Sequence, residues 1–175
     1  MKDTGKADVI LGIRIKSENK SIALSQSHYV EKVLKKFNYL NCSPVSTLMD
    51  PSVKLNLPNT GEPISQLECS QVIGYLMYAM TSTRPDIAFA VGQLSRYTSN
   101  PSTHHWEAIR RVLKYLKGTM NYGLVYAGFP SVLEGYTDAS WITNLEDHSS
   151  TSDWVFLLEG GAISWASKKQ TCIST

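Results

Sequence analysis

The spacing of apolar residues changes twice along this chain of 175 residues, and this change most narrows the possible folds. Within residues 66–117, apolar side chains recur every three or four positions, which is typical of helices with a buried face. Residues 7–26 and 131–167 instead contain short runs rich in β-branched and aromatic residues, bounded by polar and glycine-containing stretches, which favour strands. A helical segment between two strand-rich segments predicts an α+β fold.

The first strand-rich segment predicts a β-hairpin. Residues 7–16 and 21–26 are the two β-favouring runs, and the polar residues 17–20 between them suit a turn. A helix is expected over residues 27–37, because its apolar residues fall on one face and its lysines lie largely off that face. Residues 41–63 contain four of the seven prolines and are predicted to form a connecting loop.

Three more helices are predicted over residues 66–80, 85–97 and 102–117. Pro85 in the first turn is a start signal for the second of these, because proline fits the first helical position and cannot continue a helix. Gly118 is a typical stop signal for the third. We therefore expect a helical bundle in the middle of the chain.

The last part of the chain predicts strands over residues 133–141, 154–158 and 162–167, with connections at 144–152 and at Gly160-Gly161. A small sheet needs a helix or another sheet to cover it, and no such element follows in the sequence. We therefore expect an incomplete antiparallel sheet with one face uncovered, in a chain that looks truncated.

Composition excludes several classes of protein. No apolar run approaches the roughly 18–20 residues that a membrane span requires, and the polar N-terminus is unlike a secretory leader. Cys42, Cys69 and Cys172 lie far apart in the sequence, which favours a reducing compartment over a disulfide scaffold. We expect an intracellular protein, cytoplasmic or nuclear, without a membrane partner.

Charge is unevenly distributed along the chain. Residues 1–130 carry fifteen basic and nine acidic side chains, whereas residues 131–175 carry two basic and six acidic ones. A basic body suits a polyanionic partner and an acidic segment suits a metal ion, although ordinary solvated surface explains the same distribution.

Several segments together resemble a known family. They are MKDTGKADVILGIRI, IGYLMYAMTSTRPDIAFAVGQLSRY, HWEAIRRVLKYLKGT, and GYTDASW with the downstream STSDWVFLLEGGAISWASKKQ. In this order and at these separations they resemble the pol polyprotein of copia-type LTR retrotransposons, over roughly residues 1–175. The resemblance implies the C-terminal part of a reverse transcriptase followed by a truncated ribonuclease H.

The resemblance also implies a division of the chain. Residues 1–26 correspond to a palm-end β-hairpin, residues 27–130 to a thumb-like helical region that includes the 41–63 loop, and residues 131–175 to the N-terminal part of a ribonuclease H domain. The expected α+β fold is thus a primer-grip-like hairpin and a thumb-like bundle followed by an incomplete, three-stranded ribonuclease H-like sheet. No adjacent pair of aspartates occurs in the chain, so we expect no DNA synthesis by this chain alone.

The N-terminal hairpin resembles the part of a reverse transcriptase that grips the primer end, and Leu11, Gly12 and Ile13 would lie nearest to the primer. A glycine lets the backbone approach a phosphate closely, but Gly12 equally suits a bulge or tight packing in a half-buried hairpin. Both alternatives remain open from the residues alone.

The helix around residues 70–80 resembles the thumb helix that lies against the minor groove of the template–primer duplex. Ser70, Gly74 and Tyr78 recur every four residues and share one face, which suits contact with a duplex by shape rather than by sequence. The alternative is a buried helix in which Gly74 permits close contact with another helix.

Four basic residues on the last predicted helix suit contacts with phosphates: Arg110, Arg111, Lys114 and Lys117. Each neutralised phosphate would make binding more sensitive to salt. The alternative is a solvated helix face beside an apolar one.

Ribonuclease H cleaves the RNA strand of a hybrid with two divalent cations, Mg²⁺ in the intact family, held by several carboxylates. The motif GYTDASW aligns Asp138 with the family's first catalytic, metal-binding aspartate. The remaining family carboxylates lie beyond the segment that resembles residues 171–175, which implies an incomplete metal site and no functional cofactor here. The nearby carboxylates Glu146, Asp147 and Asp153 are expected to be solvated.

The matched region departs from the family's pattern after Asp138, where the family commonly has Ala-Asp-Trp-Ala-Gly and this chain has Ala139-Ser140-Trp141-Ile142-Thr143, and again just before the next strand. Ser140, Ser149 and Asp153 stand where the family commonly has an aspartate, a basic residue and a glycine. These departures are what relaxed selection on a fragment would produce.

We therefore expect a truncated polyprotein fragment whose ancestral function is reverse transcription and RNA/DNA hybrid cleavage, and which is catalytically inactive by itself. The expected partners are RNA/DNA hybrid or duplex nucleic acid, bound weakly and without sequence preference, and other polyprotein-derived chains. One alternative is a non-catalytic nucleic-acid-binding or interaction module retained from the thumb region. Another is a secreted effector-like protein, for which the N-terminus offers no export route.

Overall fold

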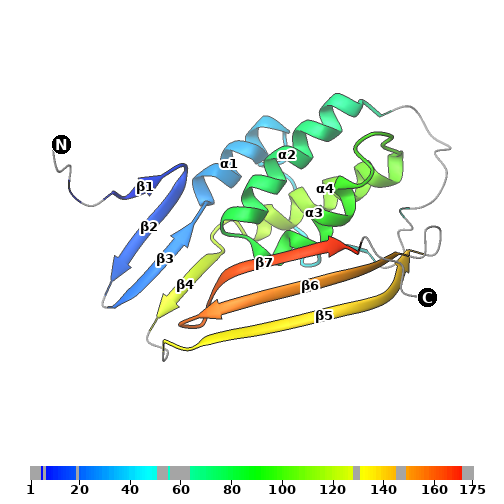
Figure 1. Ribbon diagram of the computed structural model, residues 1–175. Coiled ribbons are helices and arrows are strands. Elements are labelled where there is room, and N and C mark those ends of the chain that lie inside the picture. The colour runs from blue at the N-terminus through cyan, green and yellow to red at the C-terminus, as the bar shows by residue number, and fades with distance from the viewer. Residues whose placement is uncertain are drawn as a thin grey trace.

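The computed structural model describes residues 5, 7–18, 20–50, 55, 64–127, 131–144 and 149–170. It confirms the expected α+β class, with helices stacked on one side of a three-stranded sheet and a four-stranded sheet next to them (Figure 1). Both sheets are antiparallel between every pair of neighbouring strands.

The N-terminal hairpin is part of the four-stranded sheet rather than an isolated pair of strands. The strands of this sheet, in spatial order, are β1 (Val9–Ile10), β2 (Ile13–Glu18), β3 (Ser21–Ser25) and β4 (Gly123–Ala127). Residues 7–16 were predicted as one strand, and this is wrong. The chain reverses at Leu11 and Gly12, whose φ angles of 50° and 79° form the tight turn between β1 and β2.

Strand β4 is the element that sequence periodicity did not predict. The run is five residues long, begins with glycine and closely follows a helix, so its alternation is too short to stand out. It pairs with β3 from Ser21↔Ala127 to Ser25↔Gly123. A Cβ atom on Gly123 would lie 2.2 Å from the carbonyl oxygen of Leu24, so this pairing requires glycine.

The predicted helices are present, with small changes at their ends. They are α1 (Ser27–Lys36), α2 (Gln66–Ser82), the short 3₁₀ helix η1 (Pro85–Ile87), α3 (Ala88–Ser95) and α4 (Thr103–Gly118). Their apolar faces form a common core that includes Leu34, Leu76, Leu94 and Leu113. Of the predicted loop 41–63, residues 41–50 and residue 55 are described and carry no helix or strand, and the rest lies outside the described residues.

Gly118 has a different role from the predicted stop signal. It is the last residue inside α4, and Thr119 caps the helix. A Cβ atom on Gly118 would lie 3.2 Å from Cβ of Pro44, so the glycine lets the loop after α1 pack closely against the end of α4. Similarly, Pro85 begins a 3₁₀ turn, and the α-helix starts only at Ala88.

The start of α4 is fixed by a capping box. The Ser102 hydroxyl accepts from the backbone N–H of His105, and the Ser102 N–H donates to Nδ1 of His105 at 2.8 Å. The His105 ring stacks on Tyr97 with 4.1 Å between the ring centroids, and burial lowers the pKa of its imidazole. Only the neutral imidazole can accept the hydrogen bond from the Ser102 N–H, so the capping box requires His105 to be unprotonated.

The C-terminal sheet contains the three predicted strands, each longer than expected: β5 (Leu133–Asn144), β6 (Ser149–Leu158) and β7 (Gly161–Lys169). The turn between β6 and β7 uses Glu159 and Gly160, with φ angles of 51° and 76°, and not Gly160-Gly161. One side of this sheet faces the helices (Figure 1), and Trp165 on β7 donates from Nε1 to the Met80 carbonyl at 2.8 Å. Edge strand β5 is exposed throughout residues 131–139.

The two sheets meet where β4 runs beside the start of β7. Tyr126 on β4 donates its hydroxyl to the Ala162 carbonyl at 2.7 Å, and the backbone N–H of Ala127 donates to the Glu159 carbonyl at 3.4 Å. The Tyr126 ring lies directly over Gly161, and burial raises the pKa of its hydroxyl. The C-terminal sheet is therefore anchored at one corner to the N-terminal sheet.

Across the described ranges, no helix combines the length and the apolar character that crossing a lipid bilayer requires.

Candidate nucleic-acid interface

The outward face of α2 is a continuous exposed stripe. Two of the three residues predicted on this helix, Ser70 and Gly74, are exposed, and the third, Tyr78, is half-buried. The large apolar side chains of Leu67 and Met77 lie on the same face and are 70% and 43% exposed. The opposite face is buried in the core, so α2 presents exposed apolar and small residues to solvent, together with the polar residues Gln71 and Thr81.

Gly74 faces open space. Among the residues that the structure describes, a Cβ atom built on it would meet nothing within 4 Å, so Gly74 does not serve a close contact between the described helices. A glycine in the middle of an exposed helix costs about 0.5–1 kcal/mol relative to alanine. The N-terminus of α2 is capped by Ser65, whose hydroxyl accepts from the Glu68 N–H.

The β1–β2 turn lies beside this stripe. Leu11 at its tip is 83% exposed, and the hydroxyl of Tyr78 donates a hydrogen bond to the Leu11 carbonyl. A Cβ atom on Gly12 would meet nothing within 4 Å, so this glycine supplies the positive φ of the turn and not a tight packing contact. This hydrogen bond places the Leu11 carbonyl, and with it the tip of the turn, beside α2.

A group of aromatic side chains under the stripe was not predicted. Tyr29 on α1 makes an edge-to-face contact with Tyr78, with 5.0 Å between the ring centroids, and donates to the Tyr75 carbonyl at 3.1 Å. Lys36 donates to the Tyr75 hydroxyl at 2.8 Å, and Phe37 packs edge-on against the same ring. The signal in the sequence is the pair Tyr75 and Tyr78, three residues apart and therefore neighbours on one helix face.

The basic residues of α4 divide into two groups. Arg111 is fastened to the loop after α1: it donates to the Thr47 carbonyl at 3.2 Å and to the Thr47 hydroxyl at 2.6 Å, and lies 3.4 Å from the Asp50 carboxylate. Arg110 and Lys114 line an open hollow of about 390 Å³ between α4 and this loop, together with Val45, Met49, Asp50, Glu107 and Ala108. Arg111 therefore supports the hollow, and Arg110 and Lys114 remain available at its rim.

Lys117 lies near the end of the same helix and faces α1. Its charge is among the causes that lower the pKa of the Glu31 carboxyl, after the hydrogen bond and charge of Lys35. Lys117 therefore already interacts with an acidic neighbour.

Asp138 lies on β5, opposite Asp153 on β6. Directly opposed residues of antiparallel strands point to the same face, so these two carboxylates lie side by side on the sheet. A cavity of about 290 Å³ between this sheet and α3 is bordered by both aspartates, Phe89 and Trp165. Like charges at opposed positions repel, which makes this pair a local cost to the sheet.

The carboxylates that the structure describes do not fit a magnesium site by themselves. No group of three or more potential metal-ligating side chains gathers within the described ranges. Mg²⁺ requires near-octahedral oxygen ligands, of which Asp138 and Asp153 supply only two side chains. Glu146 and Asp147 lie outside the described residues.

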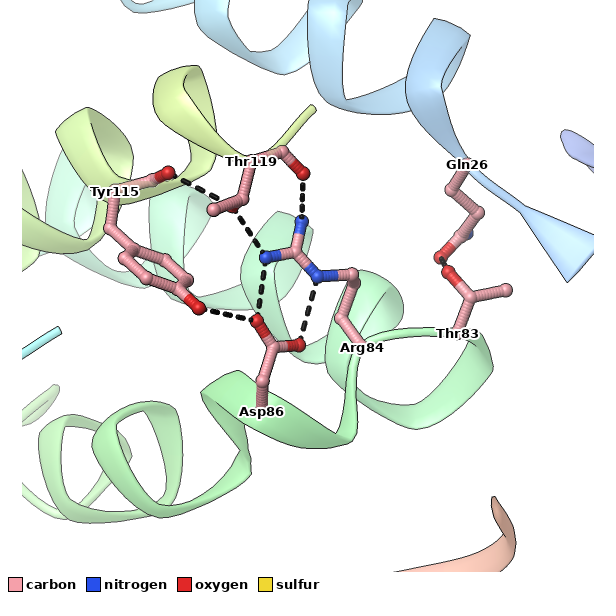
Figure 2. Close-up of polar contacts among 6 residues, drawn as sticks. All are labelled: Gln26, Thr83, Arg84, Asp86, Tyr115 and Thr119. Atoms are coloured by element: carbon pink, nitrogen blue, oxygen red, sulfur yellow. Dashed lines mark hydrogen bonds and ion pairs between the residues drawn. The ribbon is translucent and has the colours of Figure 1, made fainter. Parts of the chain in front are cut away.

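A buried ionic network supports the helices that carry these surfaces (Figure 2). Arg84 is 1% exposed and donates from Nε and Nη2 to the two carboxylate oxygens of Asp86, at 2.9 and 2.7 Å. It also donates to the carbonyl and hydroxyl oxygens of Thr119, at 3.1 and 2.7 Å, and Tyr115 donates to Asp86 at 3.0 Å. The network joins the α2–η1 connection to the end of α4, so it fixes how these two helices sit relative to each other.

Comparison with known proteins places the chain among transposon proteins. It is 43% identical over 182 residues to the retrovirus-related Pol polyprotein from transposon TNT 1-94 of Nicotiana tabacum, which covers 99% of this chain and 14% of that polyprotein. It is 32% identical to an uncharacterized mitochondrial protein of Arabidopsis thaliana, covering 99% of this chain and 72% of that protein. It is 47% identical over 103 residues to a secreted RxLR effector protein of Plasmopara viticola, covering 58% of this chain and 72% of that protein. No family model and no solved structure matches the chain.

Proposed function

This chain belongs to the family of retrovirus-related Pol polyproteins of copia-type transposons, and we propose that it binds RNA/DNA hybrid or duplex nucleic acid without reading its sequence. It spans only a small part of the polyproteins it matches, 14% in the first of them. In this proposal residues 1–26 are the primer-gripping end and residues 27–130 the thumb of a reverse transcriptase, and residues 131–175 are the N-terminal part of a ribonuclease H.

The observation that carries the proposal is the exposed glycine in the middle of α2. Gly74 is exposed between Ser70 and Met77 on the outward face of α2, and Tyr78 on the same helix bonds to the tip residue Leu11. A surface that is small, partly apolar and free of charge suits the sugar edges of a duplex minor groove, which is recognised by shape. The same surface would be a net cost if it only faced water.

Replacing Gly74 tests the proposal directly. The Gly74→Ala variant is expected to be more stable to urea by about 0.5–1 kcal/mol, because alanine restricts the unfolded chain and has space here. Gly74→Leu is expected to lower the affinity for a labelled RNA/DNA hybrid about tenfold, equivalent to about 1.4 kcal/mol, because its side chain would keep the backbone from the groove.

The control for this test is Asn100→Leu, which adds the same side chain to an exposed position between α3 and α4. It should leave hybrid binding unchanged. Gly74→Leu that binds as tightly as the wild type would contradict the proposed interface. With magnesium present, we expect the RNA strand to remain intact, because Asp153 is the only carboxylate of the described residues placed opposite Asp138.

The hollow between α4 and the loop after α1 would supply cationic groups for phosphates. Arg110→Glu combined with Lys114→Glu is expected to weaken hybrid binding and to reduce the slope of log affinity against log salt by about 0.7–0.9 for each phosphate that is no longer neutralised. Lys32→Glu combined with Lys35→Glu changes the net charge equally on exposed positions of α1 and is the control. Equal slopes for the two double variants would mean that this stripe is only a solvated helix face.

The Plasmopara viticola relative does not change this proposal. Its name describes secretion and an effector role for that protein, and its match covers 58% of this chain. The match to the Pol polyprotein covers 99% of the chain, including both sheets and all the helices.

A further inference from the structure

The Tyr78 hydroxyl joins two segments that are 67 residues apart, the β1–β2 turn and α2. We infer that Tyr78 is a positioning residue, which holds the turn against α2 so that Leu11 and Gly74 present one rigid surface to a duplex. This inference rests on the proposed function. It assigns Tyr78 a different part from the direct duplex contact that the resemblance implies.

The turn needs an external support, because its own conformation is costly. Leu11 adopts a left-handed conformation with φ at 50°, which is unfavourable for a residue that carries a Cβ atom. Strand β1 is only two residues long and pairs with β2 at the edge of the sheet, so few ladder bonds hold the turn. The carbonyl that accepts the Tyr78 hydroxyl belongs to Leu11 itself. The hydrogen bond therefore acts on the residue that carries the strain.

The Tyr78 side chain is well placed to act as this support, because its ring is held from the other side. Tyr29 on α1 packs edge-on against it at 5.0 Å, and the Tyr29 hydroxyl is tied to the Tyr75 carbonyl at 3.1 Å. Burial, with the neighbouring Tyr75 and Tyr78, raises the pKa of Tyr29 to about 12, so Tyr29 stays a neutral donor at physiological pH. The Tyr78 ring is thus held by Tyr29 on one side, and its hydroxyl binds the turn on the other.

The consequence for binding is geometric. A shape-reading surface gains affinity when its parts are held in the bound arrangement before the partner arrives, because less ordering is required on binding. Leu11 is 83% exposed and can contact a duplex only if the turn stays beside α2. The Tyr78 hydroxyl has its donor engaged within the protein, so it acts on the duplex through the position of Leu11.

The hydrogen bond between Tyr78 and the β1–β2 turn is tested first without nucleic acid. Tyr78→Phe removes only the hydroxyl, and we expect faster hydrogen exchange at the amides of Gly12 and Ile13 with little change in global stability. The matched control is Tyr75→Phe, which removes a hydroxyl from the same helix and the same aromatic group, where it accepts from Lys36 and does not touch the turn. Unchanged exchange at the turn in Tyr78→Phe would overturn the inference.

The second test is a double-mutant cycle on hybrid binding. Leu11→Ala should lower affinity in the wild type, and its effect should shrink at least threefold in the Tyr78→Phe background, because Leu11 is then no longer held in place. Additive effects of the two substitutions on the binding free energy would overturn the positioning role, because they would mean that the contribution of Leu11 does not depend on Tyr78. If neither the wild type nor any variant binds hybrid, the proposed function fails. The hydrogen-exchange result alone then decides whether Tyr78 holds the β1–β2 turn against α2.

Discussion

Replacing Arg84 with alanine is expected to lower the free energy of unfolding by about 1–3 kcal/mol, the usual cost of leaving buried hydrogen-bonding groups without a partner. The variant would leave the Asp86 carboxylate with Tyr115 as a remaining donor and would remove the two Arg84 donors to Thr119, at the junction of α2, η1 and α4 (Figure 2). Urea denaturation followed by circular dichroism measures the change. Arg84→Lys should also be strongly destabilising, because one ammonium group cannot replace the planar fork that reaches both residues.

Arg111→Ala is the matched control, because it breaks an arginine–aspartate pair of the same chemistry at the surface. The Arg111 and Asp50 side chains are 32% and 38% exposed, and their closest charged atoms lie 3.4 Å apart. Such pairs are worth about 0–1 kcal/mol. Arg84→Ala and Arg111→Ala variants of equal stability would mean that burial of the Arg84 network contributes nothing.

Gly161→Val is expected to destabilise the protein by about 1–3 kcal/mol, although valine favours strands. A Cβ atom at this position would lie 2.4 Å from the Tyr126 ring and 2.9 Å from the Val125 carbonyl oxygen, so β4 and β7 would be forced apart. We expect an earlier change in Trp165 fluorescence during urea denaturation, because Trp165 lies on β7 and bonds to α2. Loss of this corner would loosen the C-terminal sheet from the rest of the molecule.

Two variants decide whether the effect comes from this contact. Ser164→Val introduces the same side chain at an exposed position of β7 and should cost little. Tyr126→Ala removes the ring that Gly161→Val would strike, so the two changes together should destabilise less than the sum of their separate effects. Strict additivity would show that Gly161 is needed for another reason.

The sequence was a good guide to elements whose periodicity runs over many residues. The apolar spacing of α2 and α4 and the alternation in β5 predicted their type and approximate bounds. It failed where a single local feature decides the structure. The reversal at Leu11-Gly12 depends on two positive φ angles, and β4 is too short for its pattern to stand out from the loop around it.

For the candidate interface too, the sequence predicted the local arrangement of residues and not their tertiary surroundings. Ser70 and Gly74 were predicted to share a face because their spacing on a helix fixes this, whatever the rest of the chain does. Whether that face is buried or exposed is a tertiary property, and the sequence left both alternatives for Gly74 open. Exposure was decided by where α1, α3 and α4 pack, which is against the opposite face of α2.

By itself, the sequence determined the family, the α+β class, and the order of the helices and of the three C-terminal strands, because motifs and periodicities are local properties of the chain. Only the tertiary structure decided that Arg84 is buried and bonded to several residues, and that Tyr78 bonds to Leu11. It also decided that Arg111 binds the loop after α1, whereas Arg110 lines the hollow beside it. Each of these depends on side chains from segments far apart in the sequence. Their meeting is set by how the apolar faces pack, and no local pattern records it.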